Sequence, residues 1–188
     1  MRYGSGDTHP TEDLAVSRPI LSDAFAHHVW ATDKILETCE RLGVDQLGTP
    51  VPGTYGSIIE TLRHTIGADA SYLSLLSDGK VSDIDEYQMD IPALRAAMRE
   101  LGPVWQWLVA QDLDPDRQFV RHREDGSTST APLGVRLAQV IHHGTDHRSQ
   151  VCTALSNLGI EPPEIDVWAW ANTLDMLGET PASDNADG

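Results

Sequence analysis

The feature that most constrains the fold is the recurrence of apolar residues at helical spacing over four long segments. Glycines, prolines and polar turns separate these segments, which span residues 19–42, 57–77, 90–111 and 132–158. Helical periodicity over twenty or more residues predicts an amphipathic α-helix, and four such helices bury their apolar faces most economically against one another. The sequence therefore predicts an all-α protein, a four-helix bundle.

Capping and stop residues predict where the helices begin and end. Ser57 and Glu60 have the spacing of a capping box, in which each side chain bonds the backbone amide of the other residue. Gly43 and Gly159 follow the first and fourth segments, and a glycine in the left-handed conformation commonly ends a helix. The other helix starts are assigned to Pro19, Asp90, Thr130 and Pro132.

Three shorter patterns complete the predicted architecture. Gly102-Pro103 lies inside the third helix, where the proline removes a hydrogen bond and predicts a kink. Residues 117–131 place Asp125-Gly126 between β-forming residues, which predicts a short hairpin between the third and fourth helices. Residues 165–177 are predicted to form a short fifth helix.

Polar composition marks both ends of the chain. Residues 1–18 lack the apolar stretch of a secretory leader, and residues 178–188 form an acidic tail. We therefore expect flexible ends around a single helical domain at residues 19–177. The sequence contains no run of 18 apolar residues, so we expect a cytoplasmic protein without a membrane partner.

Charge and cysteine content exclude two further classes. The formal charge is −16, from 29 acidic and 13 basic side chains, and a surface of this sign repels the phosphate backbone of nucleic acids. We therefore expect no nucleic-acid partner. Cys39 and Cys152 both fall inside predicted helices and form no C-x-x-C pair, which excludes a disulfide framework.

Histidines on the fourth helix indicate a metal site. At about 100° per residue, His147 lies within the inward apolar stripe, His143 lies at its edge, and His142 points away. His143 and His147 have the i, i+4 spacing that presents two imidazoles on one helix face. Two imidazoles hold a divalent ion poorly, so a third ligand must come from another helix. His28 and His64 are the candidates, and periodicity alone favours His28.

Two motifs choose between these candidates. Segments 62–73 and 140–150 resemble the paired motifs of the DinB/YfiT superfamily of four-helix metalloproteins. The matching residues are His64 and Asp69 in the first motif, and His143, His147, Arg148 and Gln150 in the second. In that family one histidine of the second helix joins two of the fourth in binding a metal ion. The resemblance therefore implies that His64, His143 and His147 are the metal ligands.

The resemblance also implies a divalent ion and a catalytic role. Zinc, nickel and iron suit an imidazole-rich site. Relatives include S-transferases and isomerases that use a low-molecular-weight thiol as cosubstrate, and others described as metal-dependent hydrolases. The rival interpretation is a non-catalytic, metal-stabilised stress-response or binding protein. A structural site closes its fourth position with a protein ligand; the motifs offer none, so we favour an enzyme, with no nucleophile or general base assigned.

Asp69 and Arg148 are expected to lie beside the ligands. Asp69 falls near the middle of the inward stripe of its helix, where an unpaired carboxylate is costly. Its partner is either Arg148, as an ion pair, or the imidazole N–H of a metal ligand. We favour the ion pair, because such pairs between buried helices are common.

A homodimer is the expected assembly. The predicted fifth helix carries Trp168 and Trp170, and the hairpin leaves the edge of a strand without a partner. Contact between two copies of the chain would bury part of this surface.

Overall fold

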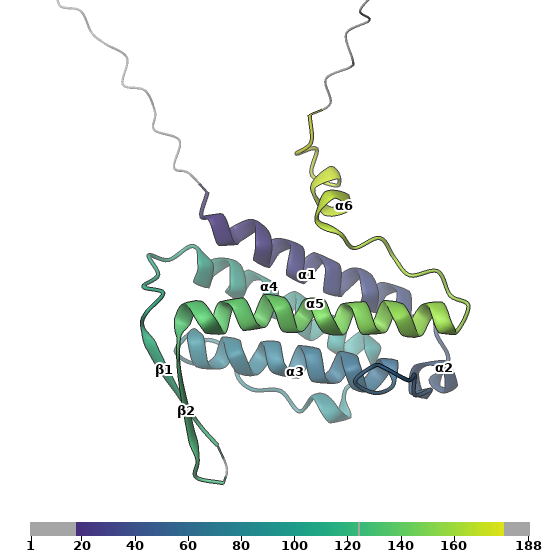
Figure 1. Ribbon diagram of the computed structural model, residues 1–188, viewed down its shortest axis with the longest axis horizontal. Coiled ribbons are helices and arrows are strands. Elements are labelled where there is room, and N and C mark those ends of the chain that lie inside the picture. The colour runs from purple at the N-terminus through teal and green to yellow at the C-terminus, as the bar shows by residue number, and fades with distance from the viewer. Residues whose placement is uncertain (1–17, 124, 179–188) are drawn as a thin grey trace, which may run out of the picture.

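The computed structural model describes residues 18–123 and 125–178, most of which lie in helices (Figure 1). The long helices are α1 (Ile20–Cys39), α3 (Ile58–Leu76), α4 (Ile91–Val109) and α5 (Leu133–Asn157). Helices α1 and α3 each pack against both α4 and α5, and the apolar faces of all four helices enclose one core. The described part of the chain is therefore mostly helical, in agreement with the predicted all-α class.

The short elements lie around this helical core. They are α2 (Val44–Gly48), the 3-10 turn η1 (Glu86–Gln88), strands β1 (Gln118–His122) and β2 (Thr128–Pro132), and α6 (Val167–Asn172). The two strands pair antiparallel, which confirms the predicted hairpin. In Figure 1 the hairpin projects beyond the helices near the start of α5, and α6 lies beside α1.

Three of the predicted local signals act as expected. The Ser57 amide donates to Glu60 Oε2 at 2.8 Å, and the Glu60 amide donates to Ser57 Oγ at 3.4 Å, so the capping box before α3 is formed. Asp90 Oδ1 accepts the Ala93 amide at 2.9 Å and caps α4. Gly159 has a φ of +73° just after α5, the left-handed conformation that favours glycine at a helix end.

Other boundaries differ from the prediction. Helix α1 ends at Cys39, and Gly43 has a φ of −73°, so Gly43 does not act as a left-handed stop. Gly43 instead precedes α2, a five-residue helix too short to give a periodic signal, and its amide donates to Gln46 Oε1 at 3.0 Å. Thr130 belongs to β2 and does not cap α5.

The last helix is also shorter than predicted. Helix α6 begins at Val167 because Asp166 Oδ1 accepts the Ala169 amide at 2.8 Å and caps the helix there.

Helix α4 continues through Pro103, and the kink expected at that point stays a prediction. The preceding Gly102 lies against α1, where an added Cβ would lie 3.0 Å from Val29 Cγ1.

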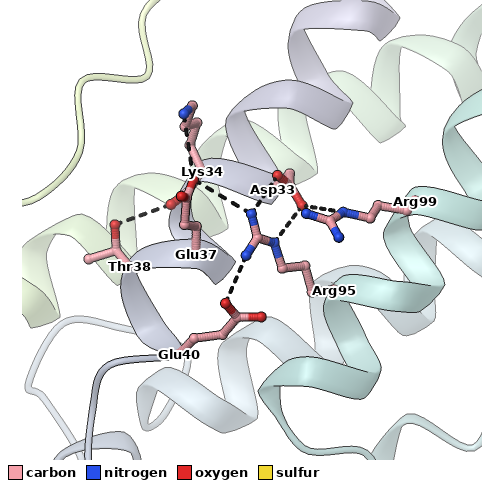
Figure 2. A network of polar contacts seen from close by, with 7 residues as sticks. All are labelled: Asp33, Lys34, Glu37, Thr38, Glu40, Arg95 and Arg99. Atoms are coloured by element: carbon pink, nitrogen blue, oxygen red, sulfur yellow. Dashed lines mark hydrogen bonds and ion pairs between the residues drawn. The ribbon is translucent and has the colours of Figure 1, made fainter.

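A network of ion pairs joins α1 to α4 on the outside of the core (Figure 2). Arg95 donates through Nε to Asp33 Oδ1 at 2.8 Å and through Nη1 to Glu40 Oε2 at 2.7 Å. Arg99 Nε donates to the same Asp33 oxygen at 3.2 Å, and Glu37 lies 3.6 Å from Arg95. The hydrogen bond from Arg95 lowers the pKa of Asp33 below its ordinary value.

The flexible ends predicted at residues 1–18 and 178–188 fall outside the described residues, apart from Arg18 and Gly178. These ends, and the domain bounds of 19–177, stay predictions. Within the described residues, no helix has both the length and the apolar content needed to span a membrane.

Candidate metal centre

Helices α3 and α5 bring three histidines together. His64 comes from α3, and His143 and His147 come from successive turns of α5. One ring nitrogen of each histidine lies within 4.8 Å of the other two, and His64 Nε2 is 3.0 Å from His143 Nε2. The rings are inclined to one another by 63 to 87°, so their edges converge. We call these residues the three-histidine cluster.

The other two histidines considered from the sequence lie elsewhere. His142 is exposed, as the helical wheel predicts. His28 is fully buried in α1 and is not part of the cluster, although periodicity favoured it over His64. The arrangement in space therefore agrees with the motif-based choice of His64.

Gln150 and Tyr55 hold the cluster from outside. Gln150 Oε1 accepts the Tyr55 amide at 2.9 Å and lies 3.0 Å from His147 Nδ1. Because an amide oxygen only accepts, His147 carries its proton on Nδ1 and leaves the Nε2 lone pair free. The Tyr55 ring stacks on His64, with 4.2 Å between centroids and 11° between planes.

Burial keeps His64 and His143 in the form that binds metal. Desolvation, together with the charges of the nearby His147 and His64, lowers the pKa of His143 to about 4. Desolvation, followed by the charge of His147, also lowers the pKa of His64. Both imidazoles are therefore neutral at pH 7, and neutral imidazole is the ligand form.

The geometry of the cluster fits a divalent ion. Tetrahedral zinc with Zn–N bonds of 2.0–2.1 Å separates its nitrogen ligands by about 3.3 Å. The 3.0 Å between His64 Nε2 and His143 Nε2 is close to that separation. His143 Nδ1 is buried without a hydrogen-bond partner among the described residues. No hydrogen bond of Nδ1 there therefore opposes the ring orientation that brings Nε2 toward His64.

A second buried group lies beside the cluster and differs from the expected arrangement. Asp69 Oδ2 accepts a hydrogen bond from His28 Nε2 at 2.6 Å, and Arg148 Nη1 donates to His28 Nδ1 at 3.0 Å. The direct Asp69–Arg148 ion pair that we favoured is therefore wrong, because the His28 ring lies between the two charges. We call these three residues the buried triad.

Gly144 makes the buried triad possible. It stands on α5 between His143 and His147, at the position where helical H-E-x-x-H zinc sites have glutamate. A Cβ at residue 144 would collide with the His28 ring and would lie 2.9 Å from Arg148 Nη1. Gly144 therefore leaves the space in which the His28 side chain of α1 reaches Arg148 of α5.

The cysteines are not poised as nucleophiles. Burial raises the pKa of Cys39 to about 12 and also raises the pKa of Cys152. Both thiols therefore stay protonated at neutral pH, and neither belongs to the three-histidine cluster.

Sequence reasoning missed Tyr55 and Glu86. Glu86 in η1 lines a cavity together with His64 and His143. It packs against Gly67, where an added Cβ would lie 2.6 Å from Glu86 Oε1. Gly67 was the available signal, because glycine inside a helix costs about 1 kcal/mol and marks a close approach.

Comparison with known proteins agrees with the two motifs. A family model described as the DinB family matches residues 17–179, from before α1 to beyond α6. No curated protein gives a significant match to the chain.

Proposed function

The chain belongs to the DinB family, and on this premise we propose that it is a metal-dependent enzyme whose His64, His143 and His147 hold one divalent ion. The observation that carries the proposal is the convergence of three imidazoles, with ligand atoms within 4.8 Å of one another. Among the described residues, no fourth His, Cys, Asp or Glu joins this group. Coordination positions would therefore remain for water or substrate.

The residues around the cluster support a catalytic use. A divalent ion in this position supplies Lewis acidity and lowers the pKa of a coordinated water or thiol. Gln150 fixes the His147 tautomer, and Tyr55 holds the His64 ring by stacking. A cavity of about 450 Å³ opens on His64 and His143, enough space for a small molecule. Zinc, nickel and iron are the candidate ions.

Two reaction classes follow from this proposal. In one, a low-molecular-weight thiol is the cosubstrate of an S-transfer or isomerisation; in the other, water is the nucleophile of a hydrolysis. The thiol must come from a second molecule, because Cys39 and Cys152 are held protonated. A panel of thiols and electrophiles distinguishes the two classes.

The first experiment measures metal and turnover together. Protein purified without chelator should hold about one divalent ion per chain by elemental analysis, and the loaded protein should turn over a member of the thiol or ester panel. Tight binding of metal with no turnover would favour the non-catalytic, metal-stabilised alternative. Protein that stays empty and takes up no zinc, nickel or iron on titration would contradict the proposal.

We also propose that the chain forms a homodimer and does not bind nucleic acid. Trp168 and Val167 on α6 are 72% and 54% exposed, which leaves apolar surface for a second copy to cover. The formal charge of −16 opposes nucleic acid. Light scattering should give a dimer mass at micromolar concentration; a monomer mass, or tight binding to duplex DNA at physiological salt, would contradict these statements.

A further inference from the structure

The cavity beside the three-histidine cluster carries charges of both signs. His64 and His143 line one part of it, and Arg121 of β1 lines another. Asp83 and Glu86, from the connection between α3 and α4, also line it. The metal centre, a cation and two carboxylates therefore face one space of about 450 Å³.

Arg121 is held toward α3 by the register of the hairpin. Phe119, two residues earlier and on the same face of β1, is 7% exposed and belongs to the core. Arg121 Nη2 donates to Ser71 Oγ of α3 at 2.9 Å. Among the described residues, no carboxylate lies within ion-pair distance of Arg121, whereas Arg95 contacts three (Figure 2). Arg121 thus keeps donors available for a ligand.

Glu86 is held in the cavity by its contact with α3. Gly67 lies one helical turn after His64, and its missing side chain leaves the space that the Glu86 carboxylate occupies. Within the described part of the chain, no hydrogen bond or ion pair involves the carboxylates of Glu86 and Asp83. The carboxylates and Arg121 therefore line the same cavity without forming an ion pair with one another.

We propose that this cavity binds a small zwitterion whose carboxylate pairs with Arg121 and whose ammonium group pairs with Glu86. The inference rests on the proposed function in one respect: it makes such zwitterions the substrate class of the metal centre. His64 and His143 line the same cavity as Arg121 and Glu86, so a ligand bound there would lie beside the three-histidine cluster.

Charge repulsion would make the cavity select zwitterions over dicarboxylates and diamines. A dicarboxylate would bring its second negative charge into a cavity that Asp83 and Glu86 also line, and a diamine would bring its second positive charge into a cavity that Arg121 lines. The formal charge of −16 further disfavours anions that lack a compensating cation. A zwitterion offers a carboxylate to Arg121 and an ammonium group to Glu86, and it brings no net charge.

Calorimetric titration tests the proposal on metal-free and on zinc-loaded protein. The probes are β-alanine, γ-aminobutyrate and ε-aminohexanoate, with glutarate and cadaverine as the dicarboxylate and diamine of similar length. At least one of the three zwitterions should bind about tenfold more tightly than glutarate and cadaverine, the scale of one charge-assisted hydrogen bond.

Matched variants assign the two ends of the ligand. Arg121→Gln and Glu86→Gln should each weaken zwitterion binding about tenfold, and Arg121→Lys should weaken it less because the charge remains. Arg123→Gln is the control for Arg121, since Arg123 bonds Ser127 Oγ at 3.1 Å and does not line this cavity. Asp85→Asn, an exposed neighbour of Glu86, is the control for Glu86. Both controls should bind as the unaltered protein does.

Three results would overturn the inference: binding of none of the probes, equal binding of glutarate, or unchanged binding by Arg121→Gln. The result is separable from the fate of the metal proposal. Zinc uptake without zwitterion binding would overturn the zwitterion site and leave the metal centre intact. Zwitterion binding to protein that takes up no metal would overturn the enzyme proposal and the role of zwitterions as its substrates, and it would leave the zwitterion site intact.

Discussion

The buried triad and the three-histidine cluster lie side by side and use histidine in opposite ways. In the buried triad, both ring nitrogens of His28 are occupied, one by Asp69 and one by Arg148. In the three-histidine cluster, only Nδ1 of His147 bonds Gln150, and the Nε2 atoms of His64 and His143 lie 3.0 Å apart. Burial alone therefore does not identify a ligand, since the most buried histidine is the one whose bonding capacity is already used.

The largest effect that tests this comparison concerns the cluster. His64→Ala, His143→Ala and His147→Ala each remove one of three nitrogen donors, and zinc affinity should fall by more than about 100-fold. That loss exceeds the roughly 10- to 100-fold loss that follows removal of a residue that only orients a ligand. Titration calorimetry against zinc measures the loss. His142→Ala is the control, because His142 is exposed and should keep unaltered affinity. Equal losses in all four variants would reject the ligand assignment.

The next effect concerns the buried triad. His28→Ala leaves the buried Asp69 and Arg148 without the ring that joins them, and the free energy of unfolding should fall by about 3–5 kcal/mol. Denaturant melts measure this, while zinc affinity should stay within a few-fold of the starting value. If His28→Ala abolishes zinc binding and His64→Ala retains it, periodicity identified the third ligand correctly and the motif did not.

A smaller effect is expected for Gln150, which contacts both the loop before α3 and the three-histidine cluster. Gln150→Ala removes the acceptor that holds the proton of His147 on Nδ1, and zinc affinity should fall about 10- to 100-fold. Ser149→Ala, an exposed neighbour on α5, is the matched control. The same zinc titration decides, and unchanged affinity in Gln150→Ala would mean that the ring is positioned by packing alone.

The smallest effect lies far from both groups, in the α1–α4 network of Figure 2. Asp33→Asn should lower the free energy of unfolding by about 1 kcal/mol, or the melting temperature by about 2–4 °C. Because Arg95 lowers the pKa of Asp33, this contribution is present above the ordinary value of 3.8 and is lost as pH falls through the lower folded-state pKa. Melting curves of both proteins should therefore converge below pH 3.8, and a difference that grows there would contradict the assignment.

Local signals in the sequence predicted most of the fold. The capping box at Ser57 and Glu60, the cap at Asp90 and the stop at Gly159 act through residues at most four positions away, so they are readable without tertiary structure. Helix α2 was missed because five residues contain little more than one helical turn.

The sequence by itself determined that His143 and His147 share a face of one helix, because the geometry of an α-helix depends only on residue spacing. Periodicity describes which face of a helix is apolar, and it does not say which residue of another helix stands opposite. For that reason it favoured His28, and only the packing of α3 against α5 brings His64 to the cluster. The Asp69–His28–Arg148 contacts join residues 41 and 120 positions apart, through space that Gly144 leaves open. Such contacts depend on how helices pack, and tertiary structure alone decided them.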